Sequence, residues 1–447
     1  MNIFGFLFTL ITSALMLRLP RNWAPLPFLM AASYVTLGQQ LEVGPMHLPV
    51  IRVLIAIGLL RVNMNGERVA RGMNSLDRAM ILWAIWCVCS LVFHTPDVLI
   101  FRLGILYDAL GIYYLFRVFI QGFEDVRTVF KIVCLLLLPV AMEMLVEKFK
   151  GINLFSAIGF GVASVNTTHG HFRAQGPFGH AILAGNVGAV CLPMALYFWR
   201  EQRKLALVGI TATAAMVFAS GSSGPVMTTL AVVAALAIWK FRAYLRVIRW
   251  ILVLLPIGLS FLMKDPPYYL LARIDITGGS TGYFRARLIE SAVEHLNEWW
   301  LAGTDYTRHW MPSGIPANGN HTDMTNYYLQ MGVWGGLLLM LLFIWVLIVA
   351  FKRVGKGLQV NKKAPFDRQF LVWTLGSILV GHATTFVSIS YFDQTFVFLY
   401  LVLACIGSLK ILQPAAAPIL RRDSTGASTK STPARRQVPS YQLQPCS

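Results

Sequence analysis

Three residues in polar segments of this chain carry side chains that can hold an anion and move a proton: Arg173, Arg285 and His321. A guanidinium group offers a planar fork of donors that grips two phosphate oxygens, which a lysine cannot reproduce. An imidazole titrates near neutrality, so it can accept a proton from a hydroxyl group. The three residue types together suit chemistry in which a hydroxyl attacks while negative charge develops on a phosphate.

Arg173 belongs to the sequence His171-Phe-Arg-Ala-Gln-Gly-Pro-Phe-Gly-His180, directly before an apolar run that begins at Ala181. We therefore expect Arg173 near a membrane surface. Gly176 and Gly179 favour a tight turn in which the backbone approaches a ligand closely. A snorkelling arginine, or one that pairs within the loop, would have the same sequence context.

Arg285 and Arg287 open a second segment, Gly282 to Trp300, whose apolar residues recur at helical spacing. These apolar residues are Leu288, Ile289, Ala292, Val293 and Leu296. The pattern predicts an amphipathic helix at the membrane interface. Cations in a first helical turn oppose the helix dipole, so a bound anion is one explanation for them. Surface salt bridges to Glu290 or Glu294 are the other explanation.

His321 lies just before the next apolar run, and Asp323, two residues later, could orient its imidazole. A loop histidine without further support is usually solvated. We expect that simpler state for His295 and His309. The tryptophans Trp299 and Trp300 are expected in the aromatic belt at the membrane interface.

The elements that must position these residues are transmembrane helices. The chain is 56% hydrophobic and 13% charged, values that exclude an ordinary soluble domain. Backbone groups left unpaired in hydrocarbon are costly, and no series of short alternating strands is present, so helices are predicted. Each needs roughly 17 to 25 apolar residues. The predicted fold is an all-α polytopic membrane protein with about twelve or thirteen transmembrane helices.

The first two candidate spans are interrupted by Pro20, Pro25 and Pro27, and they are expected to form a hairpin or one broken span. The candidate spans are Ile3–Leu17, Ala24–Leu37, His47–Leu60, Met80–Phe93, Leu99–Phe119, Val129–Val146, Ala181–Trp199, Leu205–Ser220, Pro225–Trp239, Trp250–Met263, Met331–Phe351, Phe370–Val387 and Thr395–Leu412.

Lysine and arginine collect in alternate connections, which predicts that those connections face the cytoplasm. The basic clusters are Arg61, Arg68, Arg71 and Arg78; Arg200, Arg203 and Lys204; Lys240, Arg242, Arg246 and Arg249; and Lys352, Arg353, Lys356, Lys362, Lys363 and Arg368. By this parity the loops 151–180 and 264–330 face outward. Residues 1–412 form the membrane domain, and 413–447 a disordered cytoplasmic tail.

The net charge of +18 follows largely from these dispersed loops, so anionic membrane lipids are the expected partners and nucleic acid is not. Five of the six cysteines lie in apolar runs and the sixth in the tail. We therefore expect no disulfide in the outward loops, no cysteine metal site and no cofactor.

Three stretches in this order resemble the O-antigen ligase and polymerase superfamily of bacterial envelope glycan enzymes. Ligases of this family share a histidine, a residue that is Asn, Ser or Gln, nine residues, a glycine, two residues and then Gly, Thr or Tyr. This chain has His321-Thr322, nine residues, and Gly332-Val-Trp-Gly335, in which Thr322 departs from the pattern. Arg173-Ala-Gln-Gly176 is similar to the first outward arginine motif of the family. Gly282-Tyr-Phe-Arg285, leading to Trp300-Leu-Ala-Gly303, resembles the second.

The resemblance implies a metal-independent, inverting glycosyltransferase with its active site on the periplasmic side of the bacterial inner membrane. Its donor would be a glycan linked to undecaprenyl diphosphate. By analogy, Arg173 and Arg285 would hold the donor diphosphate, His321 would be the base, and Arg287 and Asp323 would support them. Ser220-Gly-Ser-Ser-Gly224 lacks the arginine that relatives often have there, so no role is carried over.

Two acceptors remain open under this resemblance. A ligase would use lipid A core, whereas an O-antigen or exopolysaccharide polymerase would use a second lipid-linked glycan. The histidine pattern favours the ligase.

Two other classes also remain open. Trp299-Trp300-Leu-Ala-Gly303 is superficially similar to the double-tryptophan motif of metal-dependent oligosaccharyltransferases, but it lacks their aspartate at the third position. A transporter or flippase would also have many spans, and ionisable residues within spans are typical of transport pathways. The candidates for such a pathway are Arg52, Arg102, Asp108, Glu143 and His382.

Overall fold

The chain is mostly helical in the computed structural model, which describes residues 1–44, 46–163, 166–168, 170–273 and 282–409. Long apolar helices dominate these ranges, and the fold is that of a polytopic all-α membrane protein, as predicted. The predicted tail, 413–447, lies outside the described residues.

Each predicted span coincides with a helix. Among the described residues, six helices are long and apolar enough to cross a membrane. They are α4 (Ser75–Cys89) with η2 (Ser90–Phe93), α5 (Pro96–Phe119), α6 (Phe123–Lys150), α9 (Arg203–Ser220), α10 (Ser223–Ala237) with η3 (Ile238–Tyr244), and α14 (Tyr327–Val360). The other predicted spans correspond to α1 (Ile3–Arg18), α2 (Pro25–Tyr34), α3 (Val50–Asn65), α8 (Ala181–Tyr197), α11 (Leu245–Leu262), α15 (Phe366–Thr385) and α16 (Phe396–Ser408). The number of crossings expected from the sequence stays a prediction.

The proline-rich start forms two helices. η1 (Arg21–Trp23) joins α1 to α2, and the two helices pack against each other, as the hairpin alternative predicted. Pro25 lies in the first turn of α2. Backbone N–H groups in a first turn form no hydrogen bond within the helix, so proline, which lacks the N–H, is tolerated there.

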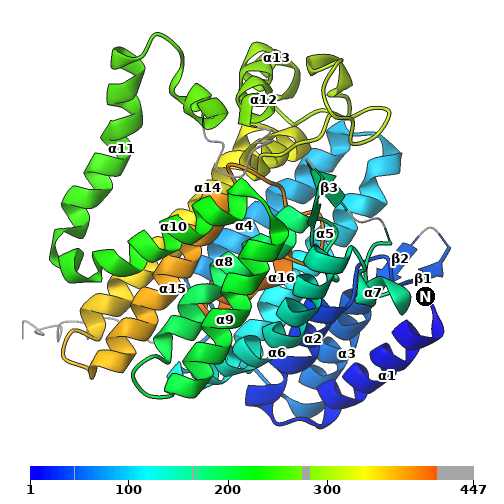
Figure 1. Cartoon of the computed structure of the whole chain (residues 1–447), viewed down its shortest axis with the longest axis vertical. Helices are drawn as coiled ribbons and strands as arrows, with labels where there is room; N and C mark the ends of the chain where they lie inside the picture. The colour runs from blue at the N-terminus through cyan, green and yellow to red at the C-terminus, as the bar shows by residue number, and fades with distance from the viewer. Residues whose placement is uncertain (45, 164–165, 169, 274–281, 410–447) are drawn as a thin grey trace, which may run out of the picture. The chain divides into compact units, whose positions relative to one another are not determined.

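Helix α8 lies at the centre of the bundle and is buried along almost its whole length. It packs against α6, α9, α10 and α15, and Figure 1 shows it among these helices. Gly185 and Gly188 face α9 and α10 so closely that an added Cβ would clash with Ser220 or with the Thr213 carbonyl. The small residues of α8 therefore permit this close packing.

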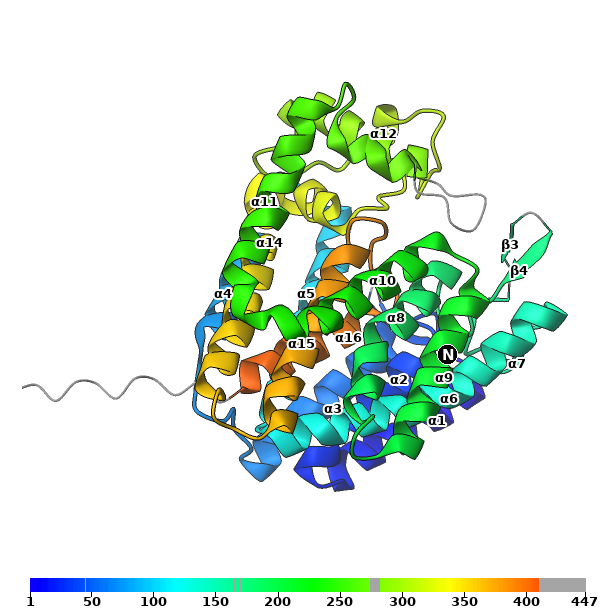
Figure 2. The ribbon, with the colours of Figure 1, turned by 60° about the vertical axis from the view of Figure 1, so that its left-hand side comes forward.

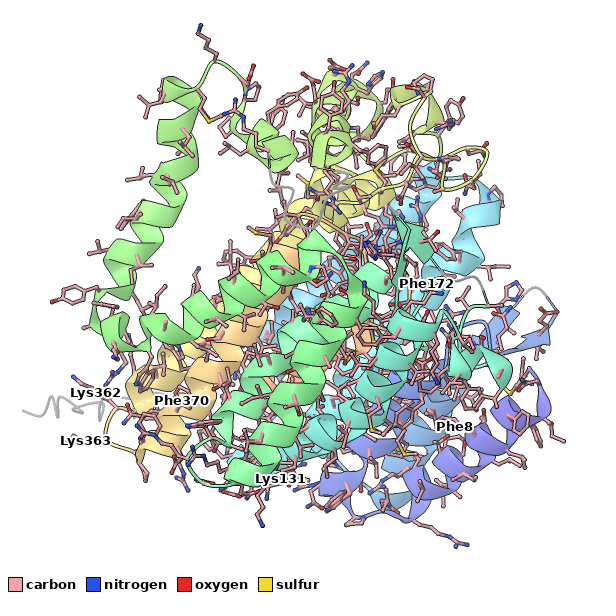
Figure 3. All side chains as sticks on the ribbon, in the orientation of Figure 1. Phe8, Lys131, Phe172, Lys362, Lys363 and Phe370 are labelled. Carbon is pink, nitrogen blue, oxygen red and sulfur yellow. The ribbon has the colours of Figure 1, made fainter. Side chains whose placement is uncertain are left out.

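The segment between α11 and α14 has a hydrophobic core of its own. It contains η4 (Pro267–Arg273), α12 (Gly282–Glu294), α13 (Leu296–Trp299) and η5 (Arg308–Trp310). Its buried core residues are Leu288, Ala292, Trp299, Trp310, Met311 and Met324, together with Val333 of α14. Figures 1 and 2 show α12 at one end of the long helices, and Figure 3 shows Lys131, Lys362 and Lys363 at the opposite end.

Helix α14 is broken near its start, and the α11–α14 segment packs into the break. Gly335 and Gly336 have non-helical backbone angles, with φ at +77° for Gly336. Thr304 N donates to Val333 O at 2.9 Å, and Leu337 N donates to Trp300 O at 2.8 Å. The backbone groups freed by the break are therefore paired, and they attach residues 300–304 to the membrane helix.

The remaining elements are short. They are α7 (Leu154–Ala157) and two antiparallel hairpins, β1 (Gln40–Val43) with β2 (Met46–Pro49), and β3 (Asn166–Thr168) with β4 (His171–Arg173).

Candidate functional site

The turn that follows Arg173 is held by the C-terminal part of α6. The Glu147 carboxylate accepts hydrogen bonds from the backbone N–H groups of Gln175 (3.0 Å) and Gly176 (2.8 Å). Asn153 Nδ2 donates to Gly176 O at 2.8 Å. A carboxylate that takes two backbone donors fixes a turn strongly. Arg173, the last residue of β4, therefore directly precedes a turn that is held in place.

Gly176 adopts φ +57°, and a Cβ there would lie 3.2 Å from Glu143 Oε2 and 3.3 Å from Met144 Cγ. We expect Gly176→Ala to lower the free energy of unfolding by about 1–2 kcal/mol, the cost of left-handed backbone for an L-residue. Chemical denaturation in detergent measures this change. Gly44→Ala is the matched control, because Gly44 has φ +58° with nothing within 4 Å. If Gly44→Ala lowers the free energy of unfolding and Gly176→Ala leaves it unchanged, the proposed strain at Gly176 is contradicted.

Arg285 points into the protein from the buried face of α12. Arg285, Leu288 and Ala292 follow one another at helical spacing, and all three are buried. The Arg285 Nε donates to the Ser388 carbonyl, between α15 and α16, at 3.0 Å. The positively charged side chain of Arg285 thus extends from the α11–α14 segment to the connection between α15 and α16.

Arg173 and Arg285 come from different parts of the chain and lie within electrostatic range of each other. Burial lowers the pKa of Arg285, and the neighbouring charge of Arg173 lowers it further. Burial also lowers the pKa of Arg173, whose guanidinium contacts Ser220 O and Ser222 Oγ. Two like charges in a desolvated place repel each other, so an anion between them would be stabilising.

His180 lies beside both arginines. Burial, and then the charges of Arg173 and Arg285, lower the pKa of His180 to about 4. The ring is therefore neutral at physiological pH. Its Nδ1 accepts from the Ile182 N–H at 3.1 Å, which places the remaining ring proton on Nε2. His180 is thus a neutral hydrogen-bond donor next to two cations.

Lys148, near the end of α6, adds a third positive charge. A Cβ placed on Gly221 would lie 3.1 Å from Lys148 Nζ and 3.5 Å from Arg173 Cγ, so both side chains lie against Gly221. We call Arg173, Arg285, Lys148 and His180 the cationic cluster. Lys148 and His180 were not among the site residues predicted from the sequence. A lysine at the outward end of a predicted span opposes the usual charge bias of membrane loops, and that departure was the available signal for Lys148.

Asp323 lies near Arg285, and Arg287 lies elsewhere. Burial raises the pKa of Asp323, while the Arg285 charge acts in the opposite direction. Arg287 is on the exposed side of α12, where it pairs with Glu290 and with Glu294. The salt-bridge explanation is therefore correct for Arg287, whereas Arg285 belongs to the cationic cluster.

His321 belongs to a neighbouring group of residues. Its Nδ1 lies 3.3 Å from Thr307 Oγ1. Burial lowers the pKa of His321 below its usual 6.5; the Asp305 carboxylate raises it and Arg102 lowers it. The charges that act on His321 are thus Asp305 and Arg102, not Arg173 and Arg285. Asp323, two residues farther along the chain, connects this group to the cationic cluster.

Asp305 is fixed in place by a buried network. It accepts from His94 Nδ1 at 2.6 Å and from the Thr95 N–H at 2.8 Å, and Arg102 NH2 lies 3.4 Å from it. His94 Nε2 lies 2.8 Å from Ala302 O, and Arg102 also donates to Trp334 O. This network ties the loop beside His321 to α5 and α14.

Gly332 of the histidine motif packs against the α11–α14 segment, and Gly303 of that segment packs against α14. A Cβ on Gly332 would lie 2.5 Å from the Trp299 ring, and one on Gly303 would lie 2.2 Å from Val333 O. Trp299 is only 3% exposed and donates its Nε1–H to Ala292 O. The prediction that Trp299 lies in the interfacial belt is therefore wrong, because its indole fills the small core. Trp300 is exposed.

Thr322, the departure from the histidine pattern, has a structural role. It is fully buried, and its Oγ1 donates to Ile315 O at 3.2 Å. Its backbone N–H donates to Thr307 Oγ1 at 3.2 Å. These bonds hold the extended segment that presents His321 and Asp323.

No protein-family model matches this chain, and no curated protein matches its sequence. The structure identifies a multi-pass helical membrane protein. Any narrower assignment rests on the chemistry of the cationic cluster and the residues beside it.

Proposed function

We propose that this protein is a metal-independent, inverting glycosyltransferase of the O-antigen ligase and polymerase type. It would transfer a glycan from undecaprenyl diphosphate to an acceptor hydroxyl on the periplasmic side of a bacterial inner membrane. One observation carries the proposal: Arg173, held by Ser220 and Ser222, and Arg285, held by Ser388, lie within electrostatic range of each other and of the neutral donor His180. That arrangement suits a diphosphate.

The cationic cluster would stabilise the leaving group. As the bond between the anomeric carbon and the diphosphate oxygen breaks, its electron pair stays on that oxygen. The guanidinium groups and the Nε2–H of His180 would donate to this developing charge. Lys148 would add a point charge at the side of Arg173.

His321 would act as the base. The acceptor oxygen attacks the anomeric carbon from the face opposite the diphosphate, and its proton passes to the imidazole. The new glycosidic bond therefore has the inverted configuration. The lowered pKa of His321 supports this role, because the ring is neutral near pH 7 and can take the proton.

The orientation proposed for the chain is consistent with its basic loops. Lys362 and Lys363, in a connection predicted to be cytoplasmic, lie at the end of the helices opposite α12 (Figures 1 and 3). With those loops inside, the cationic cluster faces the periplasm. We propose lipid A core as the acceptor, on the histidine motif alone. A polymerase that uses a second lipid-linked glycan is the alternative.

The contacts of the buried ionisable residues favour structural roles over a transport pathway. The Arg52 guanidinium pairs with Asp108, and Arg102 reaches Trp334 O and Asp305. Glu143 accepts from the Leu154 N–H, and His382 contacts the Tyr391 hydroxyl. Each of these groups links two segments of the chain.

Formation of a new covalent bond distinguishes glycan transfer from transport. The purified protein, reconstituted with an undecaprenyl-diphosphate-linked glycan and lipid A core, should release undecaprenyl diphosphate and form one new glycosidic bond of inverted configuration. Transfer should persist in EDTA without added Mg²⁺ or Mn²⁺. Mass spectrometry and NMR of the product measure both points. Movement of an intact donor across the vesicle, with every glycosidic bond unchanged, would overturn the proposal in favour of transport.

A further inference from the structure

We propose that His295, Glu298 and His309 form a binding site for one divalent transition-metal ion, best suited to Zn²⁺, in the α11–α14 segment. One ligand atom from each residue lies within 4.8 Å of the other two. No motif in the sequence connects these residues, because His309 lies in η5, well after His295 and Glu298. None of them belongs to the cationic cluster or to the residues beside His321.

The hydrogen bonds around the three side chains prepare them as ligands. His295 Nδ1 lies 2.8 Å from the Ser291 carbonyl, so Nδ1 carries the proton and Nε2 keeps its lone pair. Ligand histidines commonly have this second hydrogen bond, which fixes the tautomer and the ring orientation.

Glu298 and His309 already lie within hydrogen-bond distance of each other where the ion would bind. His309 Nε2 lies 2.9 Å from Glu298 Oε2. The Trp310 Nε1–H donates to the same oxygen at 2.9 Å. A metal ion would take the place of this hydrogen bond and accept a lone pair from each side chain.

The ligand types indicate which ion would bind. Two imidazoles and one carboxylate form a borderline nitrogen and oxygen set, which suits Zn²⁺ with water as a fourth ligand. Ca²⁺ and Mg²⁺ prefer oxygen ligands. The aromatic rings of Tyr306 and Trp310 stack on His309 and His295, respectively, and keep the imidazoles together.

The ion would join three elements of one segment. His295 separates α12 from α13, Glu298 lies in α13, and His309 lies in η5. Binding would therefore fasten the loop after Gly303 to the helix that carries Arg285. This role is structural, so transfer chemistry can remain independent of the metal.

The test is metal binding by the full-length protein in detergent. After removal of metals by a chelator, Zn²⁺ titration should show about one site per chain, and Co²⁺ should give the visible absorption of a tetrahedral complex. His295→Gln, Glu298→Gln and His309→Gln should each weaken Zn²⁺ binding more than about 100-fold, since changes even outside the ligand set cost about 10- to 100-fold. Trp310→Phe, which removes the hydrogen bond to Glu298 and keeps an aromatic ring in the core beside His295, should weaken it by about 10-fold.

His47→Gln is the matched control, because His47 also lies beside a glutamate, Glu42, but without a second histidine. It should bind Zn²⁺ as the wild type does. Circular dichroism of each variant shows whether it is folded. A wild-type protein without stoichiometric Zn²⁺ binding, or folded ligand variants that keep it, would overturn the proposal. Neither result depends on transfer activity, so the proposed function is tested separately.

Discussion

Arg285→Lys should lower the rate of glycan transfer by about 10²- to 10³-fold, the effect of losing one preorganised donor to a developing negative charge. Lysine keeps the positive charge but cannot place two parallel N–H groups on a diphosphate. Arg285 is buried, and its Nε is already committed to Ser388 O. Its two remaining nitrogens are therefore the ones available to a ligand. Initial rates with a lipid-linked donor measure the loss.

Arg273→Lys serves as the control for Arg285→Lys. Arg273 is an exposed arginine of the same α11–α14 segment, at the end of η4. Its substitution should leave the transfer rate unchanged. Equal losses in the two variants, or near-normal transfer by Arg285→Lys, would show that the buried guanidinium does not hold the donor.

His321→Ala should lower transfer by about 10²- to 10⁴-fold, the usual contribution of a general base, while the protein still inserts and accumulates normally. His321→Gln should be equally impaired, because an amide keeps the hydrogen-bonding size but accepts no proton at neutral pH. His47→Gln, an exposed histidine outside the site, is the control for expression and rate. Substantially normal transfer by His321→Ala would remove this residue from the mechanism.

The pH dependence of transfer should report the same imidazole. Because the pKa of His321 in the folded protein lies below 6.5, the neutral, proton-accepting form is present at pH 7. Activity should therefore be level near neutrality and fall only as the pH drops through that lowered pKa. His321→Gln should lose this acid limb from its residual activity. An acid limb that remains in His321→Gln would assign the titration to another group.

Much of the fold was predictable from the sequence because hydrocarbon imposes long apolar runs on helices. All the candidate spans coincide with helices, and the differences are at their ends. Helix α14, for example, begins at Tyr327 and not at Met331, since Asn326 caps it by accepting from the Leu329 N–H. A capping residue sets the start of a helix, and hydropathy alone does not locate it.

The buried face of α12 was predicted only in part. Leu288 and Ala292 are buried as expected, but Val293 is 61% exposed and Leu296 is 38% exposed. The helix ends at Glu294, and Trp299 turns back to donate to Ala292 O. The side of the helix that is buried therefore depends on a tertiary contact. Spacing alone could not separate Arg285, which faces inward, from Arg287.

Local sequence patterns could not predict that Arg173 and Arg285 lie near each other. Their proximity depends on Glu147 holding the turn after Arg173, and on Ser388 receiving Arg285. Each of these partners lies far along the chain from the arginine it positions. The two arginines predicted an anion site by their residue type, whereas only the tertiary structure shows that they lie near each other.

A double-mutant cycle on Arg173 and Arg285 tests the central claim most directly. The affinity of the purified protein for undecaprenyl diphosphate is measured for the wild type, Arg173→Lys, Arg285→Lys and the double variant. If both guanidinium groups hold one diphosphate, each single change weakens binding, and the double variant loses less than the sum, with a coupling of about 0.5–3 kcal/mol. Additive losses, or a single variant that binds as the wild type does, would mean that the two arginines do not share a ligand.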